Sequence, residues 1–217
     1  MPYHKRYHAG HMHKPTPLAL NRTVVLSVTD LTGPAGPPGI KVLFNACCFD
    51  VPAGVTALTG DEGTGKTTLL RLLAGDLPAM SGHVTTPPGG VFWVDLQGPE
   101  HDETTVQTSW DVLRPRYPAW NDGLLQNLAE ELDMSQHHDK RLNMLSTGSR
   151  RKVMVIAALA SGATVTLLDQ PFAALDLKSI RVIKDFLCEA ADHPNRAWIV
   201  ADYEAPGDIP LASVLNL

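Results

Sequence analysis

The chain has 217 residues and a mass of 23.5 kDa, a length that fits one domain with room for a small subdomain. At 44% hydrophobic and 19% charged residues it can bury a sizeable core, which excludes an intrinsically disordered protein. The net charge of −5 argues against a general nucleic-acid-binding protein, and three cysteines cannot make a disulfide framework.

Residues 1–20 are predicted to form a flexible tail ahead of one domain over residues 21–217. The tail has no apolar run, so it is not a signal peptide, and its histidines have the spacing of no closed metal site. Gly10-His11-Met12 is also typical of an expression-vector remnant. The longest apolar runs fall far short of the roughly 20 residues of a membrane span, so we expect no membrane crossing. The tail holds four of the nine histidines: His4, His8, His11 and His13.

The first half of the domain begins with two predicted strands, Val24–Val28 and Lys41–Val51. The glycines and prolines of Gly33–Gly39 predict a loop between them. A short buried strand at Val55–Leu58 then leads to a helix over Lys66–Ala74, whose leucines recur at helical spacing.

The second half alternates strands with helices, which predicts an α/β fold with a mostly parallel sheet covered on both faces. Between its first strand and the helix after Gly148 lies a polar, helix-rich region. The predicted strands are Gly90–Leu96, Val165–Leu168, Ala197–Ala201 and Val214–Leu217, and the predicted helices are Thr105–Leu113, Asn121–Leu132, a long one after Gly148, and Leu177–Ala190.

A phosphate-binding loop is the strongest motif, because Gly60–Thr67 matches GxxxxGK[ST] between a strand and a helix. Its backbone N–H groups and the helix N-terminus would cradle a polyphosphate. Lys66 would contact the β- and γ-phosphates, and the Thr67 hydroxyl would ligate Mg²⁺. The alternative is a fortuitous glycine-rich turn. The expected phosphate contacts are Gly60, Glu62, Gly63, Gly65, Lys66, Thr67 and Thr68.

Asp169 ends the apolar strand Thr164–Asp169, so it is expected at the carboxyl edge of the sheet beside the phosphate loop, where it suits Mg²⁺. The segments on either side of Asp169 indicate its function. Leu145–Ser149 (LSTGS) lies upstream, Ala173–Asp176 (AALD) follows, and Gln97 closes the segment FWVDLQ.

In this order the motifs resemble the ATP-binding subunits of ABC transporters, and the likeness covers nearly everything from Val24 to Leu217. The phosphate loop corresponds to Walker A, LSTGS to the LSGGQ signature, Leu167–Asp169 to the end of Walker B and AALD to the D-loop. Gln97 stands where the Q-loop glutamine belongs.

The resemblance implies a P-loop NTPase fold with a small antiparallel β subdomain and a reduced helical subdomain inserted at about residues 98–150. It implies ATP and Mg²⁺ as ligands, with Gln97 joining Thr67 and Asp169 on the metal. Two chains, alike or different, would close head to tail, so that each ATP lies between one Walker A and the other chain's Ser146, Gly148 and Asp176. An integral membrane permease subunit would be the further partner, with this chain cytoplasmic and peripheral on the inner face of the cell membrane.

Two positions depart from the family pattern. Gln170 stands where the catalytic glutamate follows Walker B; an amide can hold a water but cannot accept its proton, so hydrolysis should be slow. Asp202 stands where the switch histidine is expected, and an anion there would repel a γ-phosphate unless protonated or turned away. Gln170 is either native or an engineered substitution of the kind that traps an ATP-bound dimer.

Three function classes follow. The first is an ATP-hydrolysing transporter subunit impaired at Gln170 and Asp202. The second is a regulatory binding module, a degenerate ATP-gated clamp that closes on nucleotide and signals, with turnover supplied by a partner or absent. A P-loop kinase is third, and the signature and D-loop speak against it. The run Arg150-Arg151-Lys152 is interpreted as a solvated or subunit-contacting face rather than a nucleic-acid site.

Overall fold

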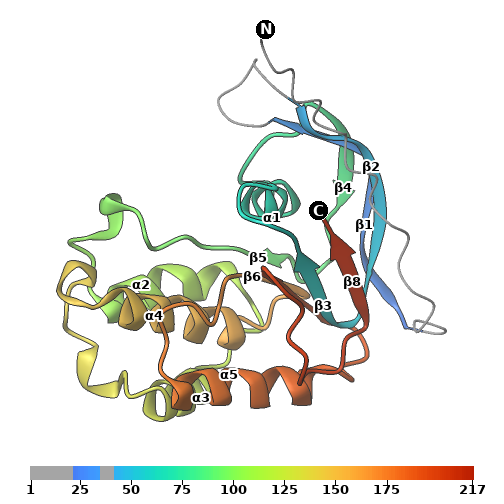
Figure 1. Cartoon of the computed structure of the whole chain (residues 1–217). Helices are drawn as coiled ribbons and strands as arrows, with labels where there is room; N and C mark the ends of the chain where they lie inside the picture. Colours follow the sequence, from blue (N-terminus) through green and yellow to red (C-terminus); the bar gives the residue numbers. More distant parts are fainter. Residues whose placement is uncertain (1–21, 35–41) are drawn as a thin grey trace, which may run out of the picture.

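The computed structural model describes residues 22–34 and 42–217 (Figure 1). The predicted tail over residues 1–20 and most of the predicted loop Gly33–Gly39 therefore lie outside the described residues. In the described part no helix is long and apolar enough to span a membrane.

A five-stranded parallel sheet forms the centre, in the order β5-β6-β7-β3-β8. Its inner strands are buried on both faces, which explains their continuous apolar sequences. The bounds are β3 Gly54–Thr59, β5 Val91–Phe92, β6 Val165–Asp169, β7 Ala197–Asp202 and β8 Ser213–Asn216.

A second, antiparallel sheet has the order β2-β1-β4, with β1 at Val24–Pro34, β2 at Val42–Pro52 and β4 at Ser81–Thr85. The prediction of a loop from Gly33 is wrong at its start, since Gly33 pairs with Phe44 in β2. Strand β4 was not predicted from the sequence; four of its five residues are exposed, so it lacks the alternating apolar pattern of a half-buried strand.

The helices cover both faces of the parallel sheet, as predicted. Figure 1 shows α1 between the two sheets and the other helices gathered on the far side of the parallel sheet. Leucines of α1 pack with the antiparallel sheet in one apolar cluster, and α2 to α5 share the other. The bounds are α1 Lys66–Ala74, α2 Val106–Leu113, α3 Asp122–Glu131, α4 Thr147–Ala160 and α5 Leu177–Ala190, with 3₁₀ turns at Pro99–His101, Arg114–Arg116, Ser135–His137 and Leu142–Met144.

The predicted strand Gly90–Leu96 is much shorter in the structure, where only Val91–Phe92 pair with β6. The strand ends early because the residues after Phe92 form hydrogen bonds with α4. The Leu96 N–H donates to the sulfur of Met154 at 3.4 Å, and the Leu96 carbonyl accepts from Arg150. These contacts replace the sheet ladder and carry the segment around Gln97 over the start of the signature helix.

Candidate functional site

The phosphate loop joins β3 to α1 in the strand–loop–helix context that the motif requires. Gly63 and Gly65 have φ angles of 77° and 102°, the left-handed region that disfavours other residues. A Cβ on Gly65 would lie 2.2 Å from Leu43 Cδ2, so a side chain is also excluded by packing. The turn is thus held tightly against β2.

An anion fits the start of α1. The N-cap is Gly65, no side chain caps the first N–H groups, and no acidic residue stands in the first turn. These N–H groups therefore remain available to a phosphate, which the helix dipole also favours. Thr68 is half-buried in this turn, whereas Glu62 is exposed on the loop.

Lys66 supplies the positive charge of the loop. Its side chain is buried, and Nζ donates to the carbonyls of Gly60 at 2.6 Å and Asp61 at 2.8 Å. Because both acceptors are neutral, the ammonium has no anionic partner among these contacts. It is therefore held over the loop and available to a phosphate group.

Thr67 and Asp169 meet at the carboxyl edge of the sheet, as predicted. The Thr67 hydroxyl donates to Asp169 Oδ2 at 2.5 Å. Burial raises the pKa of Asp169, against the hydrogen bond from Thr67 and the charges of Lys66 and Arg151. A hydroxyl and a carboxylate are the oxygen ligands that Mg²⁺ prefers, so this pair fits the metal.

The side chain of Gln97 makes its polar contact with α4. Its amide nitrogen lies 3.5 Å from Met154 Sδ on α4, and none of the polar contacts in the described part of the chain joins it to Thr67 or Asp169. Instead Asp95, two residues earlier, acts on Asp169 electrostatically, because its negative charge raises the pKa of that carboxyl. Sequence reasoning missed Asp95; the available signal was an acid three residues after the strand next to β6.

Arg150 and Lys152 are buried, so the interpretation of this run as a solvated face is wrong for both. The Arg150 guanidinium donates to Leu96 O, to Gly98 O at 2.6 Å and to the Asp102 carboxylate at 2.6 Å. This one side chain therefore fastens the segment around Gln97 to α4.

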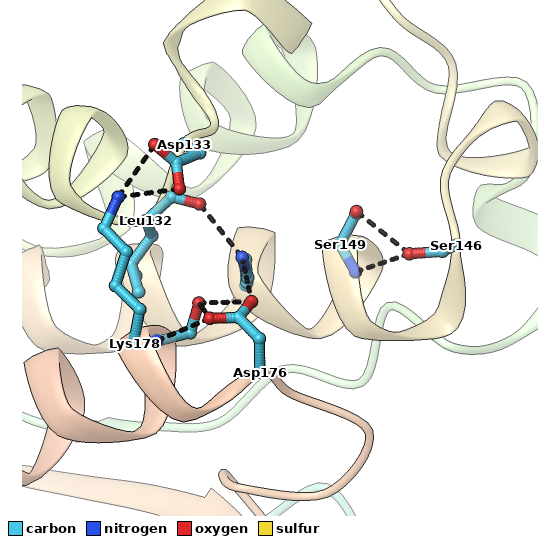
Figure 2. Close-up of polar contacts among 8 residues, drawn as sticks. Leu132, Asp133, Ser146, Ser149, Asp176 and Lys178 are labelled. Carbon is cyan, nitrogen blue, oxygen red and sulfur yellow. Dashed lines mark hydrogen bonds and ion pairs between the residues drawn. The ribbon is translucent and has the colours of Figure 1, made fainter.

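The signature region caps α4. Ser146 is the N-cap, and its hydroxyl accepts the N–H of Ser149 at 3.1 Å (Figure 2). The polar contacts of Ser146 are with Ser149, and none within the described residues reaches the phosphate loop. Nucleotide contact by Ser146 and Gly148 of a second chain stays a prediction.

The D-loop packs on the start of α4. A Cβ on Gly148 would lie 2.3 Å from the Ala174 carbonyl, so glycine permits this close approach. Asp176 caps α5 by accepting the Ser179 N–H at 2.8 Å and pairs with Lys152 at 3.0 Å, with the Asp176 group beside α4 in Figure 2. These hydrogen bonds hold the pKa of Asp176 well below its usual range. In this chain Asp176 therefore has a structural role at the helix start.

Gln170 directly follows β6, and Asp202 ends the neighbouring strand β7. Gln170 has a φ of +45°, and its N–H donates to the Ala201 carbonyl at 2.8 Å. The Asp202 carboxylate accepts the N–H of Tyr203 at 2.8 Å, and the ring of Tyr203 lies 5.0 Å from Lys66 Nζ. Sequence reasoning missed Tyr203, whose only signal was an aromatic residue directly after a strand that ends at this edge.

Known proteins share this arrangement. The ABC transporter family model matches residues 44–173, more than half of the chain. The manganese transport system ATP-binding protein MntA of Synechocystis sp. is 30% identical over 72% of this chain and 67% of its own length. The aliphatic sulfonates import ATP-binding protein SsuB 3 of Paraburkholderia xenovorans is 34% identical over 76% of this chain and 67% of its own. A solved ATP-binding subunit of an ABC transporter superposes with a TM-score of 0.65 at 20% identity, over 82% of this chain and 79% of that one, which shows a shared fold.

Proposed function

Because this chain belongs to the ABC transporter family as an ATP-binding subunit, we propose that it binds MgATP at the phosphate loop, hydrolyses it slowly and couples ATP-driven dimer closure to a separate membrane subunit. The observation that carries the proposal is the 2.5 Å hydrogen bond between Thr67 and Asp169, which joins the helix of the phosphate loop to the acid ending β6. This pairing offers hydroxyl and carboxylate ligands beside a phosphate cradle.

Binding would begin at the open N-terminus of α1, where the loop N–H groups take the phosphates. Lys66 would exchange the carbonyls of Gly60 and Asp61 for phosphate oxygens, a stronger, charge-assisted pairing. Thr67 and Asp169 would hold Mg²⁺, which when bound neutralises charge on the phosphoryl group.

Slow hydrolysis follows from Gln170. An amide can orient a water, yet it has no basic site for the proton that the water loses on attack. A positioned general base contributes about 10²–10⁴-fold to such a rate, so this chain should bind MgATP far better than it consumes it.

Coupling would run through the helical region at about residues 98–150, which we propose as a subdomain. Arg150 supports this proposal, because it ties the segment around Gln97 to the helix that Ser146 begins. A permease that moves the segment around Gln97 would thereby also move the helix that begins at Ser146. We place the chain on the cytoplasmic face of the membrane. The roles named for the relatives differ, manganese transport and aliphatic sulfonate import, so no cargo is proposed.

The test is steady-state ATP turnover, with Mg²⁺, of the wild type beside Gln170→Glu. We expect the glutamate to raise the rate about 100-fold while the dissociation constant of MgATP changes little. Gln126→Glu makes the same chemical change on the exposed face of α3 and should leave the rate unchanged. Fast turnover by the wild type, or equal rates for the two variants, would contradict the assignment of Gln170.

A degenerate clamp that closes on ATP without hydrolysis is the second candidate. It is favoured by Asp202, which stands where the switch histidine is expected and places a negative charge near the proposed γ-phosphate position. ATP-dependent dimerisation without turnover in either the wild type or Gln170→Glu would support the clamp over the slow motor.

A further inference from the structure

The turn after β7 lies against the phosphate loop. Strand β7 pairs in parallel with β3, and Asp202 is in register with Thr59, the last residue before the loop. On its other side β7 pairs with β6, where Ala201 is in register with Asp169. The end of β7 therefore faces the space between the phosphate loop and the carboxylate that is proposed to hold the metal.

Tyr203 is the first residue of this turn, and its ring lies on the loop lysine. Lys66 Nζ is 5.0 Å from the ring centroid, within the range of a cation–π contact. Lys66 is 7% exposed whereas Tyr203 is 52% exposed, so the ring covers a buried ammonium from the solvent side. The exposed part of Tyr203 is open to a ligand that approaches the loop from solvent.

The Asp202 carboxylate does not take the position of the Tyr203 ring beside Lys66. Its Oδ1 accepts the N–H of Tyr203 at 2.8 Å, so this oxygen is bonded within the turn that follows β7. The residue of this turn whose ring contacts Lys66 is Tyr203.

We propose that Tyr203 recognises the terminal phosphate of bound ATP, its hydroxyl donating a hydrogen bond to the γ-phosphate that Lys66 and the metal hold. This inference rests on the proposed function and deepens it. The ring reaches the ammonium that would bind that phosphate, and the end of β7 lies between Lys66 and Asp169, where the outermost phosphate would be. Binding of ADP would lack this contact, so Tyr203 makes the site selective for ATP.

The experiment measures dissociation constants of MgATP and MgADP by titration calorimetry for the wild type and Tyr203→Phe. A hydrogen bond to a charged group is worth about tenfold or more in affinity, so Tyr203→Phe should weaken MgATP about tenfold and leave MgADP within about twofold. Tyr117→Phe, which removes the hydroxyl of a half-buried tyrosine in the helical region, should change neither constant.

Equal weakening of both nucleotides by Tyr203→Phe, or of neither, would overturn the role of the hydroxyl. Lys66→Ala separates this failure from failure of the proposed function, because it should abolish binding of both nucleotides. A wild type that binds neither nucleotide would overturn both proposals. A thermal melt of Tyr203→Phe that matches the wild type, expected at an exposed position, would show that the fold is intact.

Discussion

At the residue scale, the Asp169 carboxylate that is proposed to hold the metal lowers the stability of the fold. Burial raises its pKa, and the nearby charge of Asp95 adds to the shift, although Thr67 donates a hydrogen bond to it. A raised pKa means that the folded chain holds the proton more tightly than the unfolded chain does, so the ionised group is a cost at neutral pH. A divalent cation at this position would remove the cost, which links metal binding to stability.

Asp169→Asn should therefore stabilise the nucleotide-free protein at pH 7.5, by about 2 °C in Tm, because it removes a buried charge and keeps an acceptor for Thr67. Since the pKa is raised, the penalty of the wild type is absent below the unfolded pKa of about 3.9 and complete above the folded one, so the gain should shrink toward pH 4.5. Mg²⁺-dependent ATP binding should be lost. The measurement is Tm by circular dichroism at both pH values.

Asp208→Asn is the control of opposite sign. Lys184 holds the pKa of Asp208 below its usual value, so that carboxylate stabilises the fold above the unfolded pKa and its loss should not raise Tm at pH 7.5. A lower Tm for Asp169→Asn than for the wild type at pH 7.5 would contradict the cost assigned to the buried charge.

Single residues also mark the limit of what the sequence predicts. Lys66 and Thr67 belong to one contiguous motif that follows a strand. The contact of Thr67 with Asp169 was predictable because the carboxyl ends of parallel strands lie at the same edge of a sheet. The direction of Gln97 and the contact of Tyr203 with Lys66 depend on how the chain turns after a strand ends. Those turns are set by partners distant in the sequence, and no local pattern carries that information.

At the element scale, the close packing of the D-loop on α4 depends on Gly148. The Ala174 carbonyl that a Cβ would meet at 2.3 Å belongs to a residue with φ +60°, and its neighbour Ala173 is held by Arg151 at 2.8 Å. The D-loop backbone at Ala173 and Ala174 therefore cannot move away from Gly148 without losing the hydrogen bond from Arg151. Gly148→Ala should therefore destabilise the chain by about 2 kcal/mol, which lowers Tm by several degrees in a thermal melt.

Gly207→Ala is the matched change, because a Cβ there meets nothing within 4 Å and the position has no positive φ. Its Tm should stay within about 1 °C of the wild type. Similar melting temperatures for the two alanine variants would show that the D-loop yields easily and that Gly148 has no packing role.

Elements with a strong local sequence pattern were predicted well. Elements whose bounds depend on contacts with distant residues were not. The helix at Lys66–Ala74 has the predicted bounds because leucine spacing and a terminal glycine act locally. The strand predicted at Gly90–Leu96 ends at Phe92 because Arg150, far along the chain, takes the Leu96 carbonyl. Burial of Arg150 was equally hidden, since a basic run at a helix start usually faces solvent.

At the scale of the whole molecule, the phosphate loop and the signature belong to helices on opposite faces of the parallel sheet. Helix α1 packs with the antiparallel sheet, and α4 packs with α2, α3 and α5 (Figure 1). Ser146 has no polar contact with the phosphate loop in the described chain. This arrangement supports the proposal that a nucleotide in contact with both lies between two chains.

MgATP should accordingly convert the chain to a dimer in sedimentation velocity, and MgADP should leave it a monomer, because slow hydrolysis at Gln170 preserves the ATP-bound form. Ser146→Ala should weaken dimerisation at least about tenfold while nucleotide binding to the monomer stays within about twofold, since it removes a hydroxyl that is proposed to contact the ATP of the second chain. Thr105→Ala is matched to it, because Thr105 is likewise a helix N-cap, of α2, and accepts from Thr108 N at 3.1 Å. Both variants lose a similar capping energy, so equal dimerisation by the two would show that Ser146 acts only as a cap and that ATP is not shared across the dimer.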